Sequence, residues 1–170
     1  MAEKNKIEDI IEKFDAEKSL KKEKSTIIKE FLIVDINSKE LGIQIEYLRE
    51  IFDLQNRDDI VPIPFTPSHV LGIINVRGEI IPVISVLKIL DMEEKTIEYN
   101  KIGIIDEKFK LAFPFTEIID MKTVDISDIR QIQNATKLNK DQFLNQEFEY
   151  EGRLINIIDF LKIYSSGYIN

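Results

Sequence analysis

The sequence predicts a mostly β protein, either a barrel or a sandwich, on the strength of two observations. Short runs of β-branched and aromatic residues alternate with turn signals along most of the 170 residues. The sequence also repeats itself in outline. Residues 78–89 match residues 152–163 at an offset of 152 − 78 = 74, and residues 41–45 match residues 111–115 at 111 − 41 = 70. Two matches in the same order at nearly one offset indicate a duplicated β module.

The N-terminal segment, residues 1–26, has a different character from the rest. Ile7, Ile10, Ile11 and Phe14 follow the spacing i, i+3, i+4, i+7, which predicts a short amphipathic helix. Residues 15–26 are nearly all polar and predict a solvated linker or an extension of that helix. Because so short a helix is marginal alone, it packs back on its own domain, frays, or docks on a partner.

Four hairpins are expected after residue 26, because each pair of apolar runs flanks a polar or Gly-containing turn. Their strands are expected at residues 31–36 with 41–45, residues 71–84 around a break at Arg77-Gly78-Glu79, residues 102–105 with 110–113, and residues 148–150 with 154–158.

The connecting segments are less regular. Residues 47–52 show helical spacing for about one turn, and residues 130–146 predict a long loop. Residues 61–67 are expected to be an extended connector, because proline has no N–H for a sheet ladder, and Pro82 predicts a strand edge or a bulge. Residues 118–121 and 124–126 form one strand or a pair. Asp159 is expected to cap a helix over residues 160–164.

Composition excludes several function classes. A net charge of −8 makes the chain a poor general binder of nucleic acid. The chain contains no cysteine and one histidine, His69, which leaves no usual zinc site. No Walker loop or G-x-G-x-x-G occurs, so we expect no cofactor. The polar N-terminus and the lack of a run of roughly 20 apolar residues predict a cytoplasmic protein without membrane insertion.

Three polar residues lie where a specific contact is more plausible than solvation: Glu50, Asn75 and Arg77. Arg77 sits at the shoulder of the hairpin over residues 71–84, with water on one side and the core on the other. That position suits a structural ion pair or a contact with a partner.

The chain resembles the CheW-like coupling proteins of bacterial chemosensory systems over residues 30–164. The matching motifs are Leu41-Gly42-Ile43, Leu48-Arg49-Glu50-Ile51, Val61-Pro62-Ile63-Pro64, Gly72-Ile73-Ile74-Asn75-Val76-Arg77-Gly78, Ile81-Pro82-Val83-Ile84-Ser85, and Gly152-Arg153-Leu154-Ile155-Asn156-Ile157-Ile158-Asp159. The resemblance implies two SH3-like five-stranded β-barrel subdomains around a shared core. The short N-terminal helix lies outside the family core, and the short C-terminal helix follows Asp159. The expected domain is 27–170, with approximate halves 27–90 and 91–165 between which strands can be exchanged.

The resemblance also implies a non-catalytic scaffold. Such a protein binds the regulatory domain of a CheA-type histidine kinase and the cytoplasmic tips of methyl-accepting chemoreceptors. It is cytoplasmic and is recruited to membrane-associated receptor arrays. The alternatives are a small acidic β-barrel enzyme or ligand-binding barrel, and a CheW-like adaptor of a non-flagellar chemosensory system.

The expected partner-binding residues are Leu48, Gly72, Ile73, Asn75 and Arg77. Gly72 would let a partner's backbone approach closely, and Leu48 has a plain core position as its alternative. Glu50 and Arg77 are assigned first to each other, with a partner contact of Arg77 as the second interpretation.

The chain departs from the family pattern at four places. Ser85 stands where Asp is usual, Phe115-Thr116 where Val-Asp is usual, and Ala112 where Gly is usual. Pro114 is expected to interrupt its strand.

Overall fold

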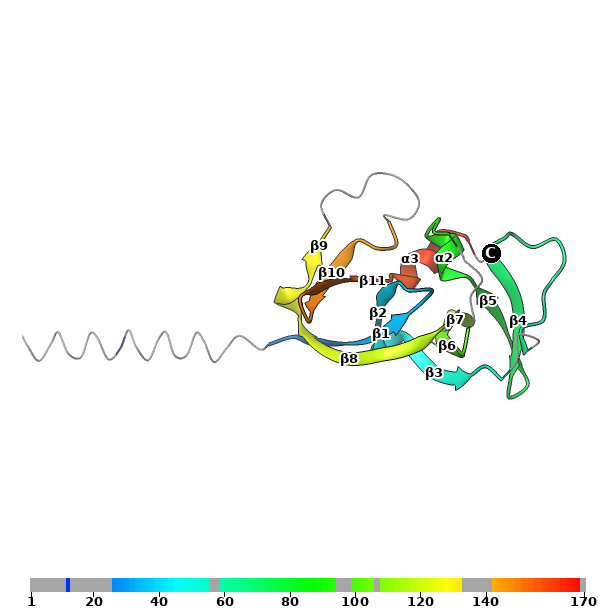
Figure 1. Ribbon diagram of the computed structural model, residues 1–170, viewed down its shortest axis with the longest axis horizontal. Coiled ribbons are helices and arrows are strands. Elements are labelled where there is room, and N and C mark those ends of the chain that lie inside the picture. Colours follow the sequence, from blue (N-terminus) through cyan, green and yellow to red (C-terminus); the bar gives the residue numbers. More distant parts are fainter. Residues whose placement is uncertain are drawn as a thin grey trace, which may run out of the picture.

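The computed structural model describes residue 12 and residues 26–55, 59–93, 99–105, 108–132 and 142–168. Apart from residues 12 and 26, the helix and linker expected over residues 7–26 lie outside the described residues. The fold is mostly β, as predicted, with two sheets and two SH3-like subdomains. Figure 1 shows the two sheets side by side, with helices α2 and α3 between them.

The first sheet has the strand order β8-β1-β2-β11-β10-β9. Its strands are β1 (Ile28–Asp35), β2 (Glu40–Gln44), β8 (Glu117–Asp125), β9 (Arg130–Gln131), β10 (Gln146–Tyr150) and β11 (Arg153–Ile157). The second sheet has the order β3-β6-β7-β5-β4. Its strands are β3 (Leu48–Asp53), β4 (Val70–Val76), β5 (Glu79–Ile84), β6 (Lys101–Ile105) and β7 (Leu111–Phe115).

Each sheet takes strands from both parts of the sequence. The hairpin β1–β2 pairs with β8 and β11 from later in the chain, and β3, β4 and β5 share a sheet with β6 and β7. Each sheet has one parallel pairing between a strand from the first part of the sequence and a strand from the second part. In the first sheet β2 pairs with β11, with Leu41 opposite Asn156, and in the second β5 pairs with β7, with Val83 opposite Ala112. Neither sheet can therefore form from one half of the sequence alone.

The four predicted hairpins are confirmed, and the local cause is visible in three turns. Pairs of residues with positive φ occupy them: Asn37 and Ser38, Arg77 and Gly78, and Glu151 and Gly152. Two consecutive residues of positive φ are typical of a two-residue type I′ turn, whose twist matches that of the flanking antiparallel strands.

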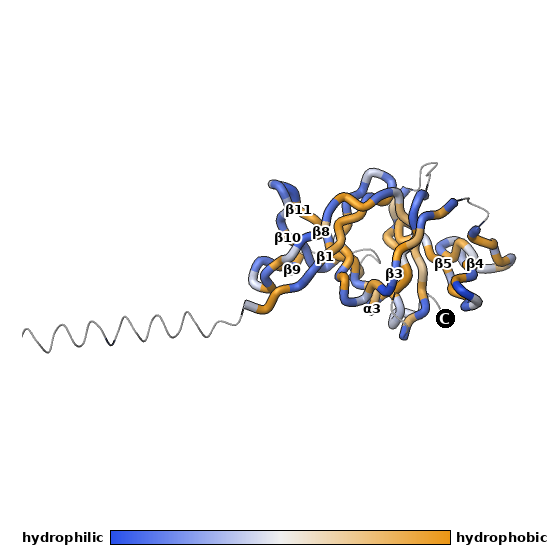
Figure 2. Tube along the Cα trace, turned by 90° about the horizontal axis from the view of Figure 1, so that it is seen from below, coloured by the Kyte–Doolittle hydropathy of each residue, from blue (hydrophilic) through white to orange (hydrophobic). Residues whose placement is uncertain are grey.

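The core has three parts. One apolar cluster lies between the sheets and combines residues of β1, β2 and β7 with both helices; it includes Leu32, Leu41, Leu87, Phe113 and Phe160. Each sheet also encloses its own cluster, around Phe31 and Phe148 in the first and around Ile81 and Ile104 in the second. Figure 2 shows apolar colour along the strands and polar colour at many of the loops. The shared cluster fixes the two subdomains against each other.

The two short helices begin in the same way. Asp159 caps α3 (Phe160–Ser165) by accepting a hydrogen bond from the Lys162 backbone N–H, as predicted. Ser85 caps α2 (Val86–Ile89) by accepting from the Lys88 N–H at 3.2 Å. Ser85 therefore makes the capping contact that an Asp would make. Two 3-10 segments are also present, η1 (Ile45–Tyr47) and η3 (Ile126–Asp128).

Several local expectations were wrong. The helical turn expected over residues 47–52 is strand β3, because pairing with β6 outweighs a weak periodicity. By contrast, residues 118–126 hold a single strand, β8, and the start of η3, which is the first of the two arrangements expected there. Part of the loop expected over residues 130–146 is the short strand β9 and the start of β10, and Phe143 is fully buried.

The expectation for Pro114 was wrong, whereas that for Pro82 is met in part. Pro114 does not interrupt β7, and Pro82 lies in β5, which has neighbours on both sides. β5 and β7 pair with each other only where Val83 meets Ala112. Neither proline takes part in the β5–β7 pairing, so its lack of a backbone N–H removes no hydrogen bond from that ladder. The ladder irregularity between Val70 and Gly72 lies close to Pro82.

Candidate partner-binding surface

Glu50 and Arg77 meet across the second subdomain. Arg77 Nη2 lies 3.2 Å from Glu50 Oε2, although the residues come from β3 and from the β4–β5 turn. The Glu50 side chain is 17% exposed, whereas that of Arg77 is 74% exposed. The carboxylate is thus fixed within the sheet while most of the guanidinium faces solvent, which leaves hydrogen-bond donors available to a partner.

The pair belongs to a chain of alternating charges. Arg49 lies 3.3 Å from Glu50 Oε1 and 3.0 Å from Glu79 Oε2, and Lys110 Nζ lies 3.1 Å from Glu79 Oε1. Hydrogen bonds from Arg49 and then Lys110 lower the pKa of Glu79 below its ordinary value of 4.5. Five alternating charges therefore connect β3, the β4–β5 turn, the start of β5 and the start of β7.

The turn itself holds Arg77 in place. The Asn75 side-chain Oδ1 accepts a hydrogen bond of 2.8 Å from the Gly78 N–H, which closes the turn around Arg77. The guanidinium carbon of Arg77 lies 5.7 Å from the centre of the Phe52 ring, within the range of a cation–π contact. Asn75 is thus a positioning residue for Arg77, and Phe52 supports the guanidinium from below.

A groove of about 420 Å³ opens beside this arginine. It lies between β3 and β4, the two terminal strands of the second sheet. Its apolar lining residues are Phe52, Leu54, Val61, Ile74, Val76 and Ile102. Its polar lining residues are Asp53, Gln55, Asp59, Asn75 and Arg77. We call it the seam groove. An apolar floor with a mixed-charge rim is the composition of a protein–protein contact.

Gly72 lies against the chain's own connector. A Cβ atom there would lie 2.2 Å from the Val61 carbonyl oxygen, and Gly72 has φ +148° and is buried. The Val61 and Ile73 backbones exchange two hydrogen bonds beside it. A close backbone approach at Gly72 is therefore made by the chain's own connector.

Leu48 and Ile73 are both half-buried. Leu48 packs against the cluster between the sheets, so its side chain supports the core and leaves part of its surface exposed. Ile73 lies opposite Pro82 on one side and Val61 on the other. Neither residue lines the seam groove, and neither has a contact that marks it as functional by itself.

An exposed apolar stretch borders the seam groove on the β4 side. Val61, Ile63 and Phe65 of the connector are exposed, as is Ile80 of β5. Phe65 is fully exposed and has φ +64°, a conformation unfavourable for an aromatic residue. A protein seldom leaves so large an apolar side chain in water without a contact to make.

Sequence reasoning missed Phe52, Phe65, Arg49 and Glu79. Phe65 carries a signal, since an aromatic residue in a proline-rich connector has no strand in which to be buried. The other three depend on which strands pair across the sheet, and no local pattern reports that.

The described residues contain no group of three or more His, Cys, Asp or Glu side chains placed to hold a metal ion. Within the same ranges, no helix is long and apolar enough to cross a membrane.

Comparison with known proteins gives a consistent picture. The family model described as a CheW-like domain matches residues 30–167. A "Chemotaxis protein CheW" of Bacillus subtilis is 28% identical over 130 residues, covering 75% of this chain and 81% of that protein. The protein of the same name from Treponema pallidum is 44% identical over 57 residues, which cover 34% of this chain and 32% of that protein.

The fold recurs in a solved structure. The scaffolding protein TtCheW of Thermoanaerobacter tengcongensis superposes with a TM-score of 0.68 at 23% identity, covering 78% of this chain and 90% of that one.

Proposed function

The chain belongs to the family of CheW-like domains, and from this premise we propose that it is a non-catalytic scaffold that couples chemoreceptors to a CheA-type histidine kinase. Its partners are the regulatory domain of the kinase and the cytoplasmic tips of methyl-accepting chemoreceptors. The names of its relatives, a chemotaxis protein and a scaffolding protein, support this assignment. The protein acts at the cytoplasmic side of receptor arrays.

The observation that carries the site assignment is the exposed Arg77 guanidinium beside an apolar groove. Binding hot spots are enriched in arginine and in aromatic residues, and they lie where apolar contacts exclude water. Arg77, Asn75 and the groove residues therefore form the contact surface, with Leu48 and Ile73 at its border. Glu50 and Arg49 act on it by holding the arginine.

Binding of purified partners tests the proposal. The full-length protein is titrated calorimetrically with the kinase regulatory domain and, separately, with a receptor cytoplasmic fragment. We expect micromolar or tighter binding to both. Arg77→Ala should weaken at least one of the two interactions by about tenfold or more, the equivalent of about 1.4 kcal/mol for a hot-spot arginine.

Arg130→Ala is the matched control. Arg130 is also an exposed arginine in an ion pair, with Glu149 at 3.8 Å, but it lies in β9 of the other sheet. We expect this variant to bind like the wild type. Absence of binding to either partner would overturn the coupling function. If Arg77→Ala binds both partners as the wild type does, the assignment of the contact surface around Arg77 is wrong, while the proposed coupling function stands.

A pull-down from cells identifies the chemosensory system. Recovery of a kinase and receptors that do not control flagella would assign the protein to another array, with the same coupling role.

A further inference from the structure

The first subdomain exposes apolar side chains to solvent near the start of β1, its first strand, and on the neighbouring strand β8. Ile28 is 56% exposed and Met121 is 63% exposed, and Ile27 and Ile126 next to them are also exposed. Leu32 of β1 lies opposite Met121 of β8. Because strand side chains alternate, Ile28, Glu30 and Met121 lie on the same face of this strand pair. We call this surface the root face.

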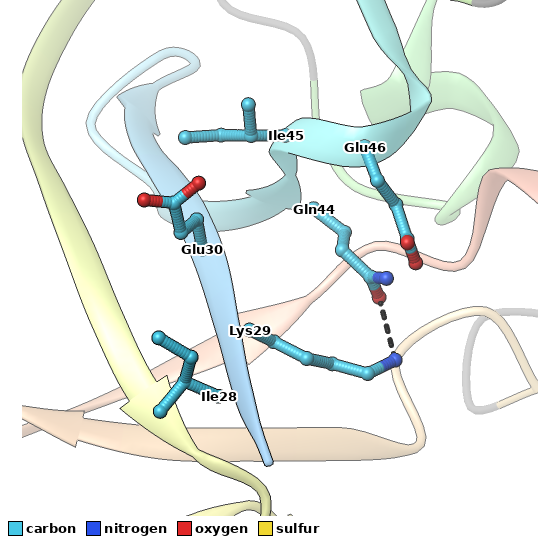
Figure 3. A pocket seen from close by; sticks show the side chains of 6 residues that line it. All are labelled: Ile28, Lys29, Glu30, Gln44, Ile45 and Glu46. Carbon is cyan, nitrogen blue, oxygen red and sulfur yellow. Dashed lines mark hydrogen bonds between the residues drawn. The ribbon is translucent and has the colours of Figure 1, made fainter.

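A second groove, also of about 420 Å³, adjoins the root face. It is lined by Ile28, Lys29, Glu30, Gln44, Ile45 and Glu46. Figure 3 shows Lys29 reaching toward Gln44 and Glu46 on one side of β1, with Ile28 and Glu30 on the other side. Lys29 Nζ donates to Gln44 Oε1 at 3.2 Å. The buried Gln44 Nε2 has no hydrogen-bond partner among the described residues.

We propose that the chain's own N-terminal segment, residues 7–14, docks on the root face and its groove. The family model begins at residue 30, so this segment and the first residues of β1 lie outside the family match. The segment supplies an apolar stripe of Ile7, Ile10, Ile11 and Phe14 to a surface that exposes Ile28 and Met121. Docking thus removes apolar area from water on both sides of the contact.

The placement of two lysines suits the same occupant, because the acidic residues Glu8, Asp9 and Glu12 lie elsewhere on the helix. In a helix over residues 6–14, Lys6 and Lys13 are seven residues apart and border one side of the apolar stripe. The groove and root face present the carboxylates of Glu30 and Glu46. A helix docked on the root face can bring one of these lysines toward Glu30, which lies on the same side of β1 as Ile28, while the stripe covers Ile28 and Met121.

The tether makes the contact feasible. Residues 15–26 give a linker of about 40 Å at full extension, at about 3.3 Å per residue, which exceeds what docking beside Ile28 requires. A short linker also gives the segment a high effective concentration at the root face, so a weak contact is enough. The same argument disfavours a separate partner protein, which would have to displace a tethered competitor.

A spin label tests the docking directly. Because the chain has no cysteine, Glu12→Cys provides a single labelling site, on the side of the predicted helix away from the stripe. We expect the label to broaden the amide signals of Ile28, Glu30, Glu46 and Met121 in the full-length protein. Ile11→Glu should abolish this broadening, whereas Asp9→Asn, on the polar side, should leave it unchanged.

Each other outcome overturns the inference. Unbroadened root-face signals mean that the segment does not dock there. In a mixing control, spin-labelled protein of natural isotope abundance is added to isotope-labelled protein that carries no spin label. Broadening in this mixture assigns the root face to a second copy of the chain. Kinase and receptor titrations of Ile11→Glu separate this inference from the coupling function, because the coupling function requires binding whether or not the segment docks.

Discussion

Glu79 and Arg153 occupy matching positions in the two repeats and carry opposite charges. Each follows the glycine of a hairpin turn and begins the next strand, and their offset is 153 − 79 = 74. Glu79 pairs with Lys110, and Arg153 pairs with Glu40, at an offset of 110 − 40 = 70. The duplicated module has therefore kept an ion pair between the same two positions while reversing its polarity. The two barrels therefore present different charges at equivalent places.

The first prediction concerns the stability contribution of Arg77. Because its side chain is mostly exposed, Arg77→Ala should lower the free energy of unfolding by only about 0.2–1 kcal/mol. Glu50→Ala should cost more, since it removes the partner of Arg77 and of Arg49 and leaves two guanidinium groups close together. Urea unfolding followed by circular dichroism measures both. Equal losses for the two variants would contradict this order.

The second prediction is a pH dependence at Glu79. Its pKa is lowered in the folded protein by Arg49 and Lys110. A lowered folded-state pKa gives stability that is present above the unfolded-state pKa and is lost as pH falls through the folded-state value. We therefore expect wild-type protein to lose more stability than Glu79→Gln on acidification from about pH 6 to about pH 3, the range that spans ordinary carboxyl pKa values.

Denaturant midpoints at a series of pH values measure this difference. Glu117→Gln is the control, because Glu117 is an exposed carboxylate at the start of β8 in the other sheet. Parallel pH profiles for wild type and Glu79→Gln would show that the charge network does not favour ionised Glu79.

The third prediction separates two glycines of positive φ. Gly72→Ala should destabilise the protein by about 3 kcal/mol or more, because the new methyl group collides with the Val61 backbone and cannot be relieved by a rotamer change. Gly78→Ala, with φ +88° and no atom within 4 Å of the added Cβ, should cost only about 1 kcal/mol of backbone strain. Thermal or urea unfolding of both variants gives the comparison, and similar losses would contradict the steric role of Gly72.

The sequence allowed the hairpins and the Asp159 cap to be predicted because their causes are local. Turn residues such as Asn37-Ser38 and Glu151-Gly152 adopt positive φ wherever two strands must reverse, so the signal lies within a few residues. Asp159 likewise contacts an N–H three residues away. The repeat offsets of 74 and 70 also follow from the sequence alone.

The rest depends on contacts between distant segments. The segment 48–52 is too short for its sequence pattern to distinguish a helical turn from a strand. It becomes a strand because it pairs with β6, about fifty residues later in the chain. The neighbour of Gly72 could not be predicted for the same reason. A glycine signals that something approaches closely, and only the fold identifies the neighbour as Val61. Arg49, Phe52 and Glu79 join Arg77 only once β3 and β5 are placed.

The last prediction concerns Ser85, where the family usually has Asp. Ser85 is 1% exposed, and its Oγ accepts from the Lys88 N–H as Asp159 accepts from the Lys162 N–H in the other repeat. If the cap is its role, Ser85→Ala should cost about 1 kcal/mol, and Ser85→Gly only a few tenths, about 0.3 kcal/mol, because glycine is itself an acceptable N-cap residue. If Ser85 instead serves mainly to fill buried space, glycine should be the worse replacement, since it removes more volume than alanine. The order of the two variants in urea unfolding therefore decides between capping and packing, and the same substitutions at Asp159, which is only partly buried, give the reference for a cap without a packing role.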